Sequence, residues 1–360
     1  MVVDFSPPET LLAQLIELRK AMIRDATHSF AQWRPFIWRS SFRSAAWNLA
    51  YYLALQQRDA QKLERALMPW GLSSLDSGIS SVLPHLDGTI ASLGAVCRIN
   101  PTLLPQHPSP RAFFRGERLL KRHTNELFGD RPCQPHDRHH WIVPCPSLPI
   151  DASFCQQLRQ QQVAALRIDL RENPKQGAAA IAQFQANQEQ TQGNGHHRCK
   201  LWLTLDEADL GDNRPDSQEQ PSQRHGLTRK EILQTADLIE ITNLGNPEAL
   251  IALHHAIQEQ TPSDRPYPGI IVSLHPEICL EQLPEIIVRG AGRYPFGIGI
   301  PPALIPEVQL SRTGQHYQAI LDRCQAACVP VILMNQTEAS PQESLNGGTS
   351  PLVAVLRSLP

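Results

Sequence analysis

The chain has 360 residues, of which 41% are hydrophobic and 6% aromatic, a composition typical of a globular protein with a sizeable core. Its 33 basic and 35 acidic residues give a formal net charge of −2, which excludes the strongly basic field of a general nucleic-acid-binding protein. No apolar run approaches the roughly 20 residues that span a bilayer, and the sequence begins without signal-peptide features. We therefore expect a cytoplasmic protein without nucleic-acid or membrane partners, whose function lies in a local site.

The first part of the chain has the periodicity of amphipathic helices. Apolar residues recur at helical spacing in four stretches, residues 9–24, 41–57, 59–72 and 80–96. A further stretch, residues 111–129, ends at Gly129, and glycine is the usual residue after a helix end. No strand pattern occurs in this part of the sequence. We therefore predict an all-α N-terminal domain over residues 1–135.

From residue 138 onward, short apolar runs alternate with longer polar segments. The runs cover residues 141–145, 163–170, 199–205, 236–242, 269–274, 295–300 and 328–334. Enough chain for a crossover helix separates each run from the next, which is the pattern of parallel βα units. Residues 138–360 therefore predict either a doubly wound sheet or a (β/α) TIM-type barrel of seven or eight strands. The final apolar stretch, residues 352–359, predicts a short closing helix.

The cysteines and histidines give little indication of a metal site. Eight cysteines are widely spaced and form no CxxC pair, which predicts reduced thiols rather than a disulfide framework. The cysteines and histidines between residues 133 and 145 have the chemistry of zinc ligands, but their spacing differs from that of paired zinc motifs. We therefore predict neither a metal ion nor a cofactor.

Several sequence motifs occur together in a characteristic order. The helical region contains GLSSL at residues 71–75 and the pattern HT..L.G at residues 123–129. The later part contains ALRIDLREN, HGLTRKEI and YQAILDRCQAACVPVIL. With these motifs the chain resembles bacterial pyruvate-kinase-like proteins that carry an N-terminal helical extension. The resemblance implies a trimmed (β/α) barrel, because the interval 205–227 is too short for the mobile cap domain of full pyruvate kinases.

The resemblance also implies candidate substrate-binding residues. Arg167 matches the arginine of the R-x-N motif of the second strand, and Asp169 replaces its asparagine. Gln336 matches the glutamine that follows the seventh strand. The fifth strand of the family ends in an essential lysine and a metal-binding glutamate, and here Ser273 and His275 occupy these positions. Arg167, Asp169, Ser273, His275 and Gln336 are therefore the residues expected at a substrate site.

The residues that phosphoryl transfer requires are missing from this set. No lysine follows residue 230, and the aspartates after residue 240 are Asp264 and Asp322, neither of which ends a strand run. Phosphoryl transfer depends on divalent metal and on cationic side chains. We therefore predict a pseudoenzyme without catalytic residues. It is expected to act as a regulatory, scaffold or partner-binding protein with an unidentified protein partner, and to bind at most a small anionic metabolite weakly through Arg167.

Other interpretations stay open at this point. One alternative is an active pyruvate kinase that converts phosphoenolpyruvate and ADP to pyruvate and ATP. Another is a lyase for small keto acids on the same barrel, which needs a metal ion or a base. At the level of single residues, Arg167 can pair with Asp169 or Glu172 instead of a ligand, and His275 can be a loop residue before Pro276.

Overall fold

The computed structural model describes residues 7–58, 60–72, 75–129, 140–145, 150–161, 163–171, 174–190, 198–206, 229–244, 246–261, 266–305, 312–334 and 353–354. The chain divides into two compact units, one formed by Met1–Arg122 with Ala319–Val329 and the other by His123–Gln318 with Pro330–Pro360. The domain boundary predicted between residues 135 and 138 lies outside the described residues.

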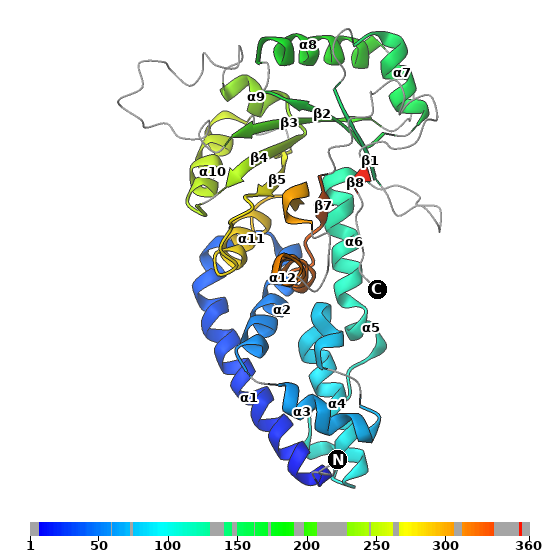
Figure 1. Cartoon of the computed structure of the whole chain (residues 1–360), viewed down its shortest axis with the longest axis vertical. Helices are drawn as coiled ribbons and strands as arrows, with labels where there is room; N and C mark the ends of the chain where they lie inside the picture. Colours follow the sequence, from blue (N-terminus) through cyan, green and yellow to red (C-terminus); the bar gives the residue numbers. More distant parts are fainter. Residues whose placement is uncertain are drawn as a thin grey trace. The chain divides into compact units, whose positions relative to one another are not determined.

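The first unit is helical in the residues that the structure describes (Figure 1). Its longest helix, α1, packs against α2 and α4, and it buries apolar residues three or four positions apart, among them Leu11, Leu15 and Met22. The helical prediction for this part of the chain is therefore confirmed. The described helices between residues 8 and 128, the last of which continues from the first unit into the second, are α1 Pro8–Trp33, η1 Arg34–Phe36, α2 Ser40–Gln56, α3 Gln61–Leu67, η2 Met68–Trp70, η3 Leu75–Ser81, α4 Val82–Val96, η4 Pro101–Leu103, α5 Pro110–Phe113 and α6 Arg115–Phe128.

Asn48 on α2 joins three segments of this unit. Its Nδ2 donates to the carbonyl oxygens of Ile79, at 2.7 Å, and Ala326, at 2.9 Å. Its Oδ1 accepts from the backbone N–H of Val82 at 2.9 Å. Val82 begins α4 and Ala326 ends helix α12 (Arg312–Ala326), so both backbone groups lack a partner within their own helix. One side chain thus satisfies helix-terminal groups far apart in the sequence.

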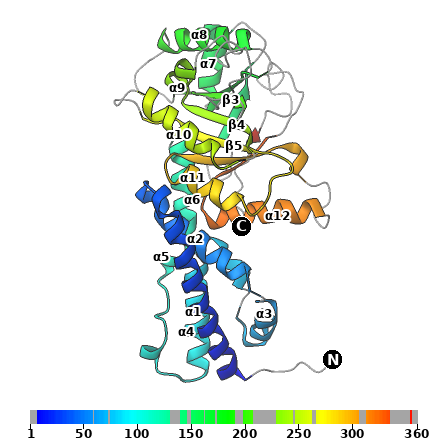
Figure 2. The same ribbon diagram turned by 90° about the vertical axis from the view of Figure 1, so that its left-hand side faces the viewer.

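The second unit contains a curled sheet, which Figure 2 shows after a turn of 90° from the view of Figure 1. Each of the seven apolar runs forms a strand, and neighbouring strands among β1 to β7 are parallel. The order within the described residues is β7-β6-β5-β4-β3-β2-β1-β8. The strands are β1 His140–Pro144, β2 Ala165–Asp169, β3 Lys200–Asp206, β4 Leu238–Leu244, β5 Gly269–Leu274, β6 Phe296–Ile300, β7 Val331–Leu333 and β8 Val353–Ala354.

Helices link the parallel strands, as the spacing of the runs predicts. Helix α8 contacts β2, and α11 contacts β6. The helices that follow β1 are α7 Ala152–Gln160, α8 Pro174–Gln190, α9 Arg229–Thr235, α10 Ala249–Gln260, α11 Leu283–Ala291, η7 Pro302–Leu304 and α12. The α/β class and the parallel sheet are therefore confirmed, whereas closure into a complete TIM-type barrel stays a prediction.

One apolar cluster fills the inside of the sheet near the amino ends of the strands. It joins residues of β1 to β5 and β7 to the end of α6, which a flat sheet with strands roughly 4.8 Å apart would not allow. The sheet is therefore curled around Leu127 and Phe128. The members are Leu127, Phe128, Ile142, Ala164, Ala165, Trp202, Leu238, Ile271 and Ile332.

Two features hold the end of α6 in place within this cluster. Gly129 has a φ of +90° and its N–H bonds to the carbonyl of Asn125, as the sequence predicts for a residue after a helix end. Lys200 at the start of β3 donates from Nζ to the carbonyl of Leu127, and burial lowers the pKa of its ammonium group. The lysine thereby satisfies a terminal helix carbonyl that would otherwise be buried without a partner.

The helix predicted for residues 352–359 is wrong for the two of these residues that the structure describes. Val353 and Ala354 form β8, which pairs antiparallel with Trp141 and His140 of β1. The free edge of β1 offers main-chain donors and acceptors, and an apolar tail segment can satisfy them as a strand. Among the described helices, none combines the length and apolar character needed to cross a bilayer.

We expect Asn48→Ala to destabilise the helical unit by about 2–4 kcal/mol, because it removes three hydrogen bonds and leaves helix-terminal groups unpaired. Urea unfolding followed by circular dichroism measures the change. The matched control is Asn100→Ala, which removes an exposed cap of η4 and is expected to cost about 1 kcal/mol or less. Equal losses in the two variants would contradict the role of Asn48.

Candidate functional site

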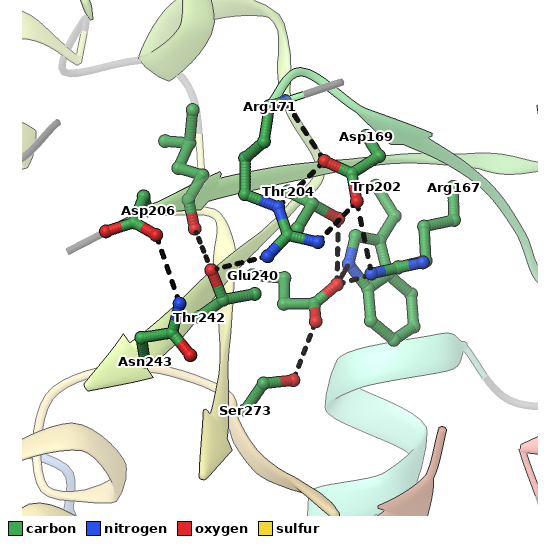
Figure 3. A network of polar contacts seen from close by, with 11 residues as sticks. Arg167, Asp169, Arg171, Trp202, Thr204, Asp206, Glu240, Thr242, Asn243 and Ser273 are labelled. Carbon is green, nitrogen blue, oxygen red and sulfur yellow. Dashed lines mark hydrogen bonds and ion pairs between the residues drawn. The ribbon is translucent and has the colours of Figure 1, made fainter. Parts of the chain in front are cut away.

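Polar side chains line the inside of the sheet near the carboxyl ends of the strands (Figure 3). Each lies two or four positions after a residue of the apolar cluster, and side chains two apart on a strand share a face. The carboxyl ends of parallel strands meet at one edge, which carries the active site in (β/α) barrel enzymes. The residues are Arg167 and Asp169 of β2, Thr204 and Asp206 of β3, Glu240 and Thr242 of β4, and Ser273 of β5.

The carboxylate of Glu240 is the centre of this arrangement, and its side chain is only 1% exposed. Both of its oxygens accept hydrogen bonds. Oε1 accepts from Ser273 Oγ at 2.6 Å. Oε2 accepts from Arg167 Nε at 2.7 Å, from Thr204 Oγ1 at 2.8 Å and from Trp202 Nε1 at 3.0 Å. The buried charge is therefore compensated by one guanidinium and three neutral donors, as burial of a carboxylate requires.

Gly299 of β6 makes room for the hydrogen bond between Ser273 and Glu240. Ser273 pairs with Gly299 across β5 and β6. A Cβ atom at position 299 would lie 2.6 Å from Ser273 Oγ, which is too close for any real Cβ contact. The absence of a side chain there therefore lets Ser273 direct its hydroxyl towards Glu240.

A second ion pair lies closer to the solvent at the end of β2. Arg171 Nε and Nη2 donate to the two oxygens of Asp169 at 2.9 and 2.5 Å. The backbone N–H of Arg171 also donates to Asp169 Oδ1 at 3.0 Å. The remaining Nη1 donates to Thr242 Oγ1 on β4 at 3.0 Å, so the arginine connects two strand ends across β3. This is the bidentate geometry that makes arginine–carboxylate pairs strong.

The pKa shifts of this pair follow from the same contacts. Burial raises the pKa of Asp169, but the hydrogen bonds from Arg171 and the charge of Arg167 outweigh burial and bring it below its usual value. The hydrogen bond and charge of Asp169 raise the pKa of Arg171 against the effect of its own burial. Both groups are therefore ionised at neutral pH.

The ends of β3 and β4 are joined by further polar contacts. Thr242 Oγ1 donates to the carbonyl of Leu205 at 3.1 Å, and Asn243 Nδ2 donates to Asp206 Oδ2 at 3.2 Å. Asn243 has a φ of +58°, a left-handed conformation that asparagine tolerates better than most residues. The pairing of β4 with β5 shifts register at this point. The left-handed residue thus redirects the chain at the exposed edge of the site.

The structure brings together three of the five predicted site residues. Arg167, Asp169 and Ser273 all belong to the network of Figure 3. His275 does not, because its Nδ1 accepts from the backbone N–H of Glu277 in the turn after β5. Gln336 lies outside the described residues. A substrate-binding role for these residues stays a prediction.

Sequence reasoning missed the residues that connect the network. Glu240, Trp202 and Thr204 were not expected at the site, and neither was Arg171. One signal was available for Glu240, which lies in the middle of the apolar run ADLIEIT. A carboxylate in a fully buried strand must find donors on its neighbours, and a site could have been inferred from it.

The two arginines of the network are paired with carboxylates of the same network, and they are also partly exposed to solvent. The side chains of Arg167 and Arg171 are 22% and 34% exposed, so both arginines are partly accessible to solvent. Among the described residues, no group of three or more histidine, cysteine and acidic side chains could hold a metal ion. The cysteine and histidines weighed as zinc ligands at residues 133–139 lie outside the described residues.

Comparison with protein-family models and with curated proteins gives no match for this chain. The resemblance to pyruvate kinases therefore depends on the sequence motifs alone.

We expect Asp169→Asn to lower stability at neutral pH by about 1–3 kcal/mol, because it removes the charged acceptor of Arg171. Since the folded-state pKa of Asp169 is lowered, its contribution is fully present above the unfolded value of about 3.9 and is lost as pH falls through the folded value. Urea unfolding of both proteins at pH 7 and pH 3 measures the difference. A difference that stays constant with pH would contradict this account.

Proposed function

We propose that this chain is a pyruvate-kinase-like pseudoenzyme that acts by binding a partner protein. The order of the sequence motifs supports the family, and the parallel α/β sheet is the type of fold that the resemblance implies. Its barrel would be a trimmed one without the mobile cap domain. The chain would serve as a regulatory or scaffold subunit rather than as a catalyst of phosphoryl transfer.

The observation that carries this proposal is the contact between Arg167 and Glu240. Arg167 matches the arginine of the family's R-x-N motif and is a candidate for binding an anion, yet its Nε donates to a buried carboxylate of the same chain at 2.7 Å. Asp169 Oδ2 lies 3.9 Å from Arg167 Nη2 and adds a second negative charge. A guanidinium that is already neutralised attracts a phosphate weakly. The carboxyl end of the sheet would therefore bind at most a small anionic metabolite, and it would bind it with low affinity.

The end of β5 supports the same interpretation. Ser273 occupies the position of the family's essential lysine, and its hydroxyl donates to Glu240. His275, at the position of the metal-binding glutamate, is engaged in a local turn. Neither side chain supplies the positive charge that stabilises a phosphoryl group during transfer.

A second candidate function is an enzyme of different chemistry on the same sheet, such as a lyase for small keto acids. The observation that favours it is the presence of two carboxylates, Glu240 and Asp169, near the carboxyl ends of the strands, where (β/α) enzymes carry their acids and bases. Metal analysis of the purified protein and incubation with keto acids, followed by NMR, separate this candidate from a binding protein.

The proposal predicts no pyruvate kinase activity. In a coupled assay with Mg²⁺, K⁺, phosphoenolpyruvate and ADP, we expect turnover at least a thousandfold below the roughly 1–100 s⁻¹ typical of kinases. Thermal unfolding with phosphoenolpyruvate, pyruvate or nucleotide should show little stabilisation. Affinity capture from native extract should then identify the protein partner.

Robust turnover that Arg167→Ala abolishes would overturn the proposal. The control is Arg198→Ala, which removes an exposed arginine paired with Asp237 outside the network. Activity lost equally in both variants would indicate a folding defect rather than a working site.

A further inference from the structure

Each guanidinium of the network is paired with a carboxylate of the same chain before any ligand binds. The residues labelled in Figure 3 include two guanidinium groups, from Arg167 and Arg171, and three carboxylates, from Asp169, Asp206 and Glu240. Arg171 is held by Asp169 in a bidentate pair, and Arg167 is held by Glu240. The sum of the charges of these residues is therefore negative, which opposes the approach of an anion.

Glu240 differs from the other two carboxylates in its position. Its side chain is 1% exposed, while that of Asp169 is 17% exposed. Water screens the charge of a buried carboxylate less than that of an exposed one, so Glu240 acts more strongly on the Arg167 guanidinium that it contacts. Glu240 holds the Nε of Arg167, so the two Nη groups lie outside that hydrogen bond, and Nη2 lies 3.9 Å from Asp169 Oδ2.

We propose that Glu240 is a built-in counter-anion that suppresses the binding of small oxyanions, such as phosphate or a carboxylate, at Arg167. The contact is autoinhibitory: the chain carries the anion that satisfies its own guanidinium. Neutralising Glu240 while Arg167 keeps its position uncovers a latent oxyanion site at the Nη groups. The inference rests on the geometry around Glu240, and it holds whether or not the chain proves to be catalytic.

Glutamine at position 240 gives a sharp test because it has nearly the same shape as glutamate. Its amide oxygen can take the place of Oε2 and accept from Arg167, Trp202 and Thr204. Its amide nitrogen can donate to Ser273 Oγ, since a hydroxyl both donates and accepts. The Glu240→Gln variant therefore removes the charge and keeps the hydrogen bonds.

The experiment is a calorimetric titration of the full chain with inorganic phosphate at low ionic strength. We expect Glu240→Gln to bind phosphate at least about tenfold more tightly than the natural chain, because a charge in direct contact with Arg167 has been removed. The gain should disappear in the double variant Glu240→Gln/Arg167→Gln. Glu240→Asp, which keeps the charge, should bind no more tightly than the natural chain.

The matched control for a general charge effect is Asp206→Asn. Asp206 is also a carboxylate of the network; it accepts a hydrogen bond from Asn243, and its charge acts on Arg171. A smaller gain in this variant than in Glu240→Gln supports the proposal, and an equal gain contradicts it. Unchanged or weaker phosphate binding in folded Glu240→Gln also overturns the proposal. Failure of Glu240→Gln to fold overturns it as well, because the charge of Glu240 would then be needed for folding of the sheet rather than for the control of anion binding.

Discussion

The polar end of the sheet depends on the burial of one carboxylate. A glutamate carboxylate at 1% exposure loses the solvation of water, and this cost is compensated only if donors surround it. The donors to Glu240 come from β2, β3 and β5, so four strands must be in register at once. A slip of one residue in any of these strands would turn its donor to the other face of the sheet. The carboxylate therefore specifies how the strands assemble as well as what the site contains.

The same contact restricts the chemistry that the site can perform. Anion binding and phosphoryl transfer need positive charge that is not already neutralised. Here Arg167 is paired with Glu240, and Arg171 with Asp169, so that the positive charge of each guanidinium is paired with a carboxylate of the same chain. A ligand has to compete with internal carboxylates for the same donors. This electrostatic arrangement opposes the binding of anions at the two arginines.

The sequence predicts the sheet well because its signals are local. Apolar runs separated by helix-length segments were sufficient to predict every strand from β1 to β7. The choice of Arg167, Asp169 and Ser273 as site residues came from the motif resemblance instead, and the structure brings the three into one network. Glu240 was missed because its significance depends on which strands lie beside β4, which no local pattern shows. The closing helix was wrong at Val353 and Ala354 for a related reason: the edge of β1, a distant segment, determines their conformation. His275 was expected at the site because the resemblance matches it to a metal-binding glutamate, but its ring accepts a hydrogen bond within its own turn.

The nature of the Glu240–Arg167 pair also argues for more than a structural role. Replacement of a buried ion pair by apolar residues of similar volume is often neutral or stabilising, so stability alone does not call for charges inside a sheet. Apolar side chains fill the neighbouring positions at the amino ends of the strands, and the fold accommodates them without difficulty. A charged pair at the carboxyl ends has two effects that an apolar pair lacks. It fixes strand register through directional hydrogen bonds, and it sets the electrostatic potential at the edge where ligands of (β/α) proteins bind. The second effect links the interior of the sheet to the electrostatics of its carboxyl edge.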